Sequence, residues 1–187
     1  MGKIVISETA SLDGLIGGSR FADWFDRMGG KDREAWAGVE FKEALDSEAL
    51  LLGRRTYEWF VARGWTSRSG EWADRLRSLP KYVVSSSLED LDWNNSTVLK
   101  SDVVNTISKL KQNVNGDIVV YGSGRLVHTL MEHDLIDELR LMICPTVIGD
   151  GERLFGKTSH QKPMRLVDTR TVGDGLVRLA YQSVRDA

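Results

Sequence analysis

The sequence contains one cysteine, three prolines and no apolar run long enough to span a membrane. The single cysteine, Cys144, excludes an internal disulfide framework and a cysteine-based zinc cluster. A membrane-spanning helix needs roughly 20 apolar residues, and the acidic Glu8 comes too early for a secretion signal. Lys and Arg (25) nearly balance Asp and Glu (27), so neither nucleic acid nor a membrane surface is an expected partner. These absences predict a soluble cytoplasmic protein.

The 187 residues, 41% of them hydrophobic, predict a single domain over residues 1–187 with a full-sized core. Short β-branched runs predict buried strands, and apolar residues at helical spacing predict helices between them. The expected strands are 3–8, 49–52, 81–85, 97–99, 118–120 and 136–144, and the expected helices lie near 41–45, 55–62, 71–78, 101–114 and 125–131. Residues 9–20 are expected to form a loop, and Ser101 is expected to cap a helix.

The chain ends in two expected strands, 164–172 and 176–184, on either side of Gly173-Asp174-Gly175. This arrangement is a strong hairpin signal. The whole pattern therefore predicts a three-layer α/β fold. Its central sheet is mostly parallel, is covered by helices on both faces, and ends in an antiparallel C-terminal hairpin.

Gly122-Ser123-Gly124 joins a buried strand to a helix. Such a junction places free backbone N–H groups and the positive end of a helix dipole at one point, which suits a phosphate. The alternative is a plain turn that uses glycine for its conformational freedom. The full G-x-G-x-x-G pattern is absent, because Val127 stands where the third glycine belongs.

Three more strand ends carry residues that bind phosphates through N–H groups, hydroxyls or positive charge. They are Gly53-Arg54-Arg55-Thr56, Ser85-Ser86-Ser87 and Lys100-Ser101. Each one alone is also compatible with an ordinary strand end or a solvated side chain. Together with the glycine stretch they predict an extended polyphosphate ligand at one edge of the sheet. The cations Arg54, Arg55 and Lys100 exceed what a pyrophosphate needs and favour NADP(H) over NAD(H).

Several pieces of the chain resemble the dihydrofolate reductase-like superfamily, in family order and spacing over nearly the whole length. Within it, the chain is most similar to the reductase domain of the bifunctional riboflavin-biosynthesis deaminase/reductase. The pieces are Ser11-Leu12-Asp13-Gly14-Leu15-Ile16-Gly17, Leu51-Leu52-Gly53-Arg54-Arg55-Thr56-Tyr57-Glu58, Lys81-Tyr82-Val83-Val84-Ser85-Ser86-Ser87, Val119-Val120-Tyr121-Gly122-Ser123-Gly124-Arg125-Leu126, and Cys144-Pro145 followed by Gly149-Asp150-Gly151-Glu152-Arg153-Leu154-Phe155. The resemblance implies about eight strands, NADPH as cofactor, and a homodimer.

The resemblance also implies which residues form the site. The cofactor residues it implies are Ile16, Gly17, Gly53, Arg54, Arg55, Thr56, Ser86, Ser87, Lys100, Gly122, Ser123, Gly124, Arg125 and Leu126. The implied substrate contacts are Thr9, Asp13, Trp36 and Phe41. Asp13 and Glu152 are the catalytic candidates, although each is also compatible with a simple turn or loop residue. No metal site is expected, since the three histidines are scattered.

One departure from the dihydrofolate reductase pattern concerns the acid on the first helix that binds the pterin ring. That acid lies four positions before the Phe that matches Phe41, and here the position is Ala37. Glu34 lies one turn earlier and Glu40 is expected to lie off the relevant face, so neither is an obvious replacement. The deaminase motif is absent too, because one cysteine cannot supply its zinc ligands.

The leading hypothesis is an NADPH-dependent reductase of a small heterocyclic substrate, pterin- or pyrimidine-like, or of another carbonyl or imine compound. A hydride-transfer enzyme needs few catalytic side chains, because the cofactor carries the chemistry. The alternative is a dimeric NADP(H)-binding module with a regulatory or redox-sensing role and little turnover.

Overall fold

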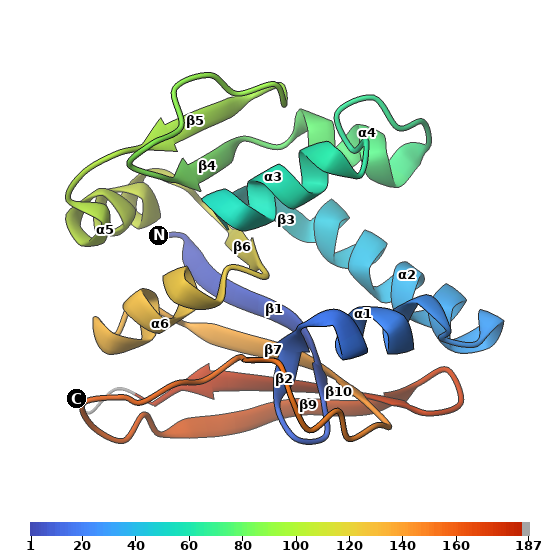
Figure 1. Ribbon diagram of the computed structural model, residues 1–187. Coiled ribbons are helices and arrows are strands. Elements are labelled where there is room, and N and C mark those ends of the chain that lie inside the picture. Colours follow the sequence, from blue (N-terminus) through green and yellow to red (C-terminus); the bar gives the residue numbers. More distant parts are fainter. Residues whose placement is uncertain (185–187) are drawn as a thin grey trace.

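A central sheet of eight strands organises the computed structural model, which describes residues 1–184 (Figure 1). The strand order is β5-β4-β3-β6-β1-β7-β10-β9. The strands are β1 (Lys3–Ser11), β3 (Ser47–Gly53), β4 (Lys81–Val84), β5 (Ser96–Leu99), β6 (Asp117–Tyr121), β7 (Glu138–Cys144), β9 (Met164–Val172) and β10 (Leu176–Ser183). Neighbours from β5 through β7 pair in parallel, while β10 pairs antiparallel with both β7 and β9. The mostly parallel sheet with an antiparallel C-terminal hairpin is confirmed.

Helices cover both faces of this sheet (Figure 1). They are α1 (Ser19–Asp26), α2 (Gly30–Asp46), α3 (Arg54–Ala62), α4 (Glu71–Ser78), α5 (Val103–Asn113) and α6 (Gly124–Glu132). Ile4 and Ile6 of β1 pack on the side of α5 and α6, whereas Val5 packs on the side of α2, α3 and α4. The central strands are therefore buried on both faces, which explains their continuous apolar runs.

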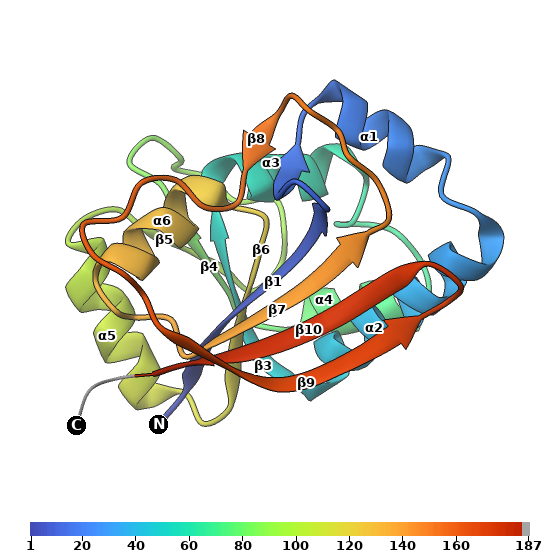
Figure 2. The same ribbon diagram turned by 90° about the horizontal axis from the view of Figure 1, so that it is seen from below.

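Residues 9–20 are not a loop, contrary to the prediction from sequence. Thr9, Ala10 and Ser11 extend β1 and pair with Met142, Ile143 and Cys144 of β7. A short strand, β2 (Leu15–Gly17), then pairs with β8 (Glu152–Arg153), and α1 follows it (Figure 2). The extension of β1 was missed because its small and polar residues have no apolar signature, although ladder pairing in the middle of a sheet holds them extended.

The predicted cap of α5 is also wrong. Asp102, in the left-handed conformation with φ 46°, occupies the N-cap position instead of Ser101. Its carbonyl accepts the hydrogen bond from the backbone N–H of Thr106 at 2.9 Å. An Asp tolerates this backbone conformation better than most residues, so the chain can turn into the helix one position later.

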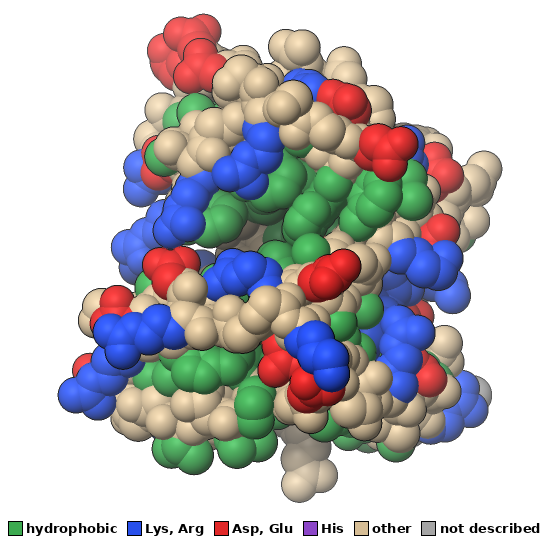
Figure 3. Space-filling view, turned by 90° about the vertical axis from the view of Figure 1, so that its right-hand side faces the viewer, with side chains coloured by type: hydrophobic (Ala, Val, Ile, Leu, Met, Phe, Trp, Pro, Cys, Tyr) green, Lys and Arg blue, Asp and Glu red, His purple; other side chains and the backbone are tan. Residues whose placement is uncertain are grey.

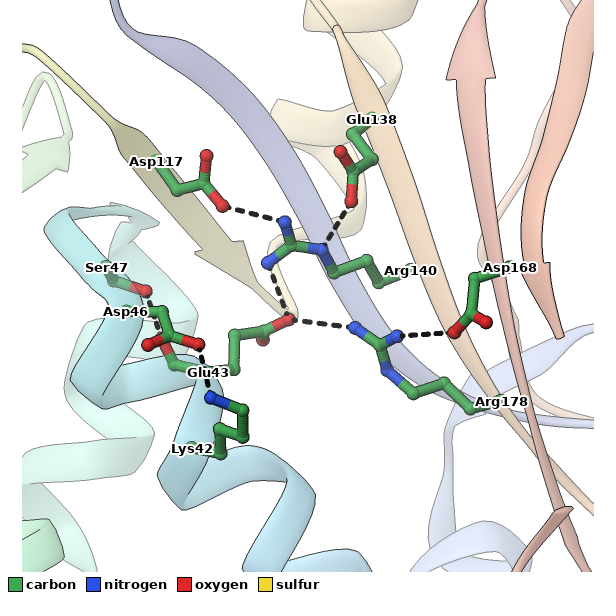
Figure 4. A network of polar contacts seen from close by, with 9 residues as sticks. All are labelled: Lys42, Glu43, Asp46, Ser47, Asp117, Glu138, Arg140, Asp168 and Arg178. Carbon is green, nitrogen blue, oxygen red and sulfur yellow. Dashed lines mark hydrogen bonds and ion pairs between the residues drawn. The ribbon is translucent and has the colours of Figure 1, made fainter. Parts of the chain in front are cut away.

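A buried network of charges fixes α2 to the sheet (Figure 4). The Arg140 guanidinium on β7 lies 3.1 Å from Glu43 of α2, 2.7 Å from Asp117 of β6 and 2.6 Å from Glu138. Arg178 of β10 also approaches Glu43, at 3.8 Å. A buried carboxylate needs such partners. Because Glu40 lies three residues before Glu43 on the same helix face, the network also fixes where Glu40 lies.

None of the helices within residues 1–184 is long and apolar enough to cross a membrane.

Candidate active site

A cavity of about 1130 Å³ opens where β3, β4, β5 and β6 end and where α1, α2 and α3 face one another. Seen from the right-hand side of Figure 1, the molecule is hollowed, with apolar side chains inside the hollow and Lys and Arg side chains along its edges (Figure 3). The carboxyl ends of parallel strands are where ligands bind in sheets of this type. We call this cavity the cleft. It has a polar end, at the strand ends, and an aromatic end, between α1, α2 and α3.

At the polar end, the N-termini of α3 and α6 are hydrogen-bonded to each other. The backbone N–H of Gly53 donates to Ser123 Oγ at 2.9 Å, and the backbone N–H of Ser123 donates to Thr56 Oγ1 at 2.9 Å. Gly122 has φ +55°, and a Cβ there would lie 2.8 Å from Thr56 Oγ1, so the close approach of the two loops needs glycine. Two helix N-termini side by side form a site for an anion.

Every residue that the resemblance assigned to the cofactor lines this one cleft. The set comprises Ile16, Gly17, Gly53, Arg54, Arg55, Thr56, Ser86, Ser87, Lys100, Gly122, Ser123, Gly124, Arg125 and Leu126. Arg54, Arg55 and Lys100 are exposed at its edge, where they can meet a phosphate from solvent. These residue types fit a dinucleotide: backbone N–H groups and hydroxyls for the pyrophosphate, and positive charge for a further phosphate.

Aromatic rings line the other end of the cleft. The rings of Phe25 and Trp36 meet edge to face with centroids 5.0 Å apart, and those of Trp65 and Trp72 do so at 5.2 Å. The whole lining set of rings is Phe21, Phe25, Trp36, Trp59, Phe60, Trp65, Trp72 and Tyr121. Trp36 is held in place because its Nε1–H donates to Thr9 Oγ1 at 3.0 Å. Such walls suit a flat ring, which can pack face to face or edge to face against them.

Three arginines lie over rings of this aromatic end. The guanidinium of Arg33 lies 5.1 Å from the Phe25 ring centroid, and that of Arg63 lies 4.8 Å from Trp59. Arg68 lies 4.7 Å from Trp65 in the same manner. All three line the cleft, so its aromatic end has a positively charged border.

Two buried carboxyl groups also line the cleft, and sequence reasoning assigned a role to neither of them. Glu8, near the end of β1, and Glu40, on α2, are each only 9% exposed. Burial raises the pKa of Glu8 to about 8; a hydrogen bond from the Gly122 backbone opposes this, and the charge of Glu152 adds to it. Burial raises the pKa of Glu40 well above its usual value, and the charges of Glu43 and Glu8 add to the effect. A buried carboxyl that keeps its proton can donate it.

The prediction that Glu40 lies off the relevant face is wrong. The alignment of Phe41 with the family pattern predicts one rotation of α2, whereas the charge network around Glu43 fixes another, which turns Glu40 into the cleft. Phe41 is half-buried and does not line the cleft, so its predicted contact with substrate is not supported.

The sequence does carry a signal for Glu8. An acid in an otherwise apolar central strand has to be buried beside a polar group or a ligand.

Asp13 lies outside the cleft, contrary to the expectation that it contacts substrate. Its carboxylate accepts hydrogen bonds from Ser11 Oγ at 2.7 Å and from the backbone N–H groups of Ile148 and Gly149 at 3.1 and 2.8 Å. The Ser11 hydroxyl, followed by these two N–H groups, lowers the pKa of Asp13 to about 2. Asp13 therefore joins two loops. Thr9, Trp36 and Glu152, the other candidates, do line the cleft.

Residues 2–178 match the model of a protein family described as the RibD C-terminal domain. YyaP, an uncharacterized protein of Bacillus subtilis (strain 168), is 29% identical over an alignment of 187 residues. The alignment covers 96% of this chain and 94% of YyaP. A putative riboflavin biosynthesis protein from Shewanella sp. PV-4 has a similar structure, with a TM-score of 0.79 at 21% identity, and the match covers 98% of this chain and 99% of that one. Dihydrofolate reductase from Enterococcus faecalis, solved with NADP(H), gives a TM-score of 0.62 at 14% identity over 97% of this chain and 96% of that one.

These likenesses confirm the expected dihydrofolate reductase-like fold. The family match also supports a reductase role for this chain.

Proposed function

This chain belongs to the RibD C-terminal domain family, and on that basis we propose that it is an NADPH-dependent reductase of a small heterocyclic substrate, pterin- or pyrimidine-like, or of another carbonyl or imine compound. One observation carries the proposal. The polar groups of four strand ends and a set of aromatic rings line the same continuous cleft. A cofactor held at one end thereby meets a substrate held at the other.

The polar end supports the cofactor part of the proposal. Gly122, Ser123 and Gly124 would hold the pyrophosphate with the N-terminus of α6, and Thr56 would add the N-terminus of α3. Ser86 and Ser87 would hold the adenosine end, and Ile16 and Gly17 would contact the nicotinamide. When it is bound, NADPH supplies the hydride. The protein's own task is to hold the two rings together and to keep water away from them.

The choice of NADPH over NADH rests on the positive charges around the polar end. Arg54, Arg55 and Lys100 are all exposed lining residues, whereas the pyrophosphate already has two helix N-termini. The surplus charge suits the 2′-phosphate that distinguishes NADPH. Arg54 also pairs with Glu58 at 3.3 Å, which keeps its side chain along α3.

The aromatic end supports a flat substrate. Trp36 and Phe25 offer ring faces and edges, and the buried Trp72 Nε1–H has no hydrogen-bond partner within residues 1–184. A buried donor of this kind is costly unless a ligand accepts its hydrogen bond. The substrate should therefore carry an acceptor atom in or on its ring.

The proposal is tested with purified protein in two steps. NADPH is first titrated while tryptophan fluorescence is followed, because six tryptophans are present and several line the cleft. The loss of NADPH absorbance is then measured with a panel that includes dihydrofolate, a riboflavin-pathway aminopyrimidine and simple imines and ketones. We expect saturable quenching by NADPH and oxidation of NADPH by at least one heterocycle.

A matched control is Lys109→Ala, which removes an exposed cation of α5 outside the cleft. It should bind and turn over like the unaltered protein. Failure of NADPH to bind would overturn the proposal. Binding without turnover across the panel would instead favour the alternative, a dimeric NADP(H)-binding module with a regulatory or redox-sensing role, and light scattering would then establish whether the protein is the expected homodimer.

A further inference from the structure

Glu8 is placed at the centre of the sheet, where the two ends of the cleft meet. The residue before it, Ser7, pairs with Tyr121 of β6, and Glu8 itself pairs with Leu141 of β7. Its carboxyl group therefore lies next to the Gly122 loop of the polar end, from whose backbone it receives a hydrogen bond. It also lines the same cavity as Thr9 and Trp36 of the aromatic end.

The Glu8 carboxyl is not fully used by the protein. Its Oε1 is buried and has no hydrogen-bond partner among residues 1–184, although the side chain lines the cleft. A buried polar oxygen left without a partner costs free energy, so such an atom facing a cavity indicates a ligand or a function. Neighbouring groups with spare hydrogen-bonding capacity, such as Tyr121 Oη, are likewise buried along the cleft.

The charged and titratable groups around Glu8 favour its protonated form. Glu152 of β8 is exposed, and its negative charge raises the pKa of Glu8 because it repels a second negative charge. Glu40 on α2 is buried; the charges of Glu8 and Glu43 raise its pKa, and that of Arg178 lowers it. Arg140 and Arg178 both form ion pairs with Glu43. The two arginines thus neutralise Glu43 rather than Glu8.

We propose that Glu8 is the acid of this site: its protonated carboxyl hydrogen-bonds the substrate and gives its proton to the atom that gains an electron pair during reduction. This inference rests on the proposed reductase function. It gives Glu8, on the first strand, the role that dihydrofolate reductases assign to an acid on the first helix, at the position that is Ala37 here. Glu152 is the residue that tunes Glu8, by placing a negative charge near it.

The step balances for a C=N or C=O bond. The carbon of that bond receives the hydride, the π electrons move to the nitrogen or oxygen, and the O–H bond of Glu8 breaks as the new N–H or O–H bond forms. Glu8 is left as a carboxylate and takes up a proton from water before the next turnover. A carboxyl with a pKa near the working pH can complete this cycle, whereas an ordinary exposed carboxyl is ionised and has no proton to give.

Glu8→Gln tests the inference, because the amide keeps the shape and a hydrogen-bond donor but cannot release a proton. The exposed Glu34→Gln on α2 is the matched control. Protonation is measured without any ligand, from the carboxylic-acid C=O infrared band as a function of pH. Glu40 is expected to keep its proton as well and to contribute a band of its own. We therefore expect protonated-carboxyl absorption near neutral pH in the unaltered protein and in the control, and loss of the Glu8 component alone in Glu8→Gln. Glu152→Gln should lower the pH at which the Glu8 component disappears.

The same variants are then compared in turnover. Glu8→Gln should bind NADPH normally and keep KM nearly unchanged, while kcat falls by about 100-fold, a typical contribution of general acid catalysis. An infrared difference between the unaltered protein and Glu8→Gln that lacks a carboxylic-acid component, or an unchanged kcat with an unchanged pH profile, would overturn the inference while leaving the reductase proposal standing. Weaker NADPH binding with normal kcat would overturn it in another way, by assigning Glu8 to the cofactor.

If neither the unaltered protein nor any of the variants binds NADPH, the reductase proposal is refuted. The infrared titration would still decide whether Glu8 holds a proton. Should Glu8→Gln not fold, Glu152→Gln answers the same question with Glu8 in place. An infrared titration that Glu152→Gln does not shift would contradict the assigned neighbourhood of Glu8.

Discussion

Thr56 and Ser123, which are 67 positions apart in the chain, are joined by two hydrogen bonds across the cleft floor. Thr56 Oγ1 accepts from the Ser123 backbone N–H at 2.9 Å and from Ser123 Oγ at 3.1 Å. Thr56 lies in the first turn of α3 and Ser123 is the N-cap of α6. The pair therefore sets the spacing of two helix N-termini, on which a pyrophosphate site depends.

Thr56→Val removes the acceptor of both hydrogen bonds while keeping the shape of the side chain. We expect the free energy of unfolding to fall by about 1–2 kcal/mol, because the partly buried Ser123 N–H loses its partner. We also expect NADPH and NADH to bind about tenfold more weakly, by equal factors, since the pyrophosphate is common to both. Chemical denaturation and fluorescence titration measure the two effects.

The control for this experiment is Ser108→Ala on α5, whose hydroxyl donates to the Val104 carbonyl; neither residue lines the cleft. It should leave both affinities unchanged. A loss of stability in Thr56→Val without any loss of affinity would show that the two helix ends do not hold the cofactor.

Arg54→Ala combined with Lys100→Ala tests the preference for NADPH. Both cations are exposed at the polar end and come from different strand ends, those of β3 and β5. We expect the double variant to weaken NADPH by about 10- to 100-fold more than NADH, because only NADPH carries the 2′-phosphate. Titrations with both nucleotides at low and high salt measure the difference, which should shrink as salt screens the charges.

Arg27→Ala combined with Lys109→Ala is the charge-matched control, since it also removes two exposed cations but none that lines the cleft. It should leave the ratio of the two affinities unchanged. Equal weakening of NADPH and NADH by the Arg54 and Lys100 changes would assign these residues to the pyrophosphate instead.

The polar end of the cleft could be predicted from sequence because its determinants are local. Gly53-Arg54-Arg55-Thr56 and Gly122-Ser123-Gly124 each follow a short apolar strand, and parallel pairing brings such strand ends to one edge. Neither inference requires knowledge of a side chain's distant neighbours. The mostly parallel sheet and the C-terminal hairpin followed from the same local signals.

The acidic part of the cleft could not be predicted in this way. The rotation of α2, and with it the direction of Glu40, depends on Arg140 and Arg178 of β7 and β10, more than 90 positions away. The role of Asp13 likewise depends on Ile148 and Gly149, which lie 135 and 136 positions later in the chain. Tertiary charge pairing of this kind leaves no periodic trace in the sequence.

Asp13→Asn tests the assignment of Asp13 to loop stability. The folded protein holds the pKa of Asp13 at about 2, below the ordinary value of 3.8, so the ionised form stabilises the fold. That stabilisation is fully present above pH 3.8 and is lost as the pH falls through about 2. We therefore expect Asp13→Asn to lower the melting temperature at neutral pH, and the difference from the unaltered protein to shrink in acid.

Asp23→Asn, on the exposed face of α1, serves as the control and should change the melting temperature little. Limited proteolysis of the 145–151 loop should accelerate in Asp13→Asn, because Ile148 and Gly149 lose a charged hydrogen-bond acceptor. A fall in kcat with an unchanged melting temperature would return Asp13 to the substrate site.

The stability of the protein should also depend on pH through Glu8, with the opposite sign. Its pKa is raised from 4.5 to about 8 by burial. Below pH 4.5 both the folded and the unfolded chains hold the proton, so Glu8 does not make the free energy of unfolding depend on pH there. Between these two values the unfolded chain has released the proton while the folded chain keeps it. The free energy of unfolding then falls as the pH rises, by up to roughly 1.4 kcal/mol per pH unit.

Glu8→Gln has no proton to release, so its stability relative to the unaltered protein should rise across this window and level off above about pH 8. Urea denaturation at a series of pH values measures the difference, and Glu34→Gln should follow the unaltered protein throughout. A constant difference between Glu8→Gln and the unaltered protein would mean that Glu8 is ionised in the folded state, and would remove the physical basis for its role as the acid.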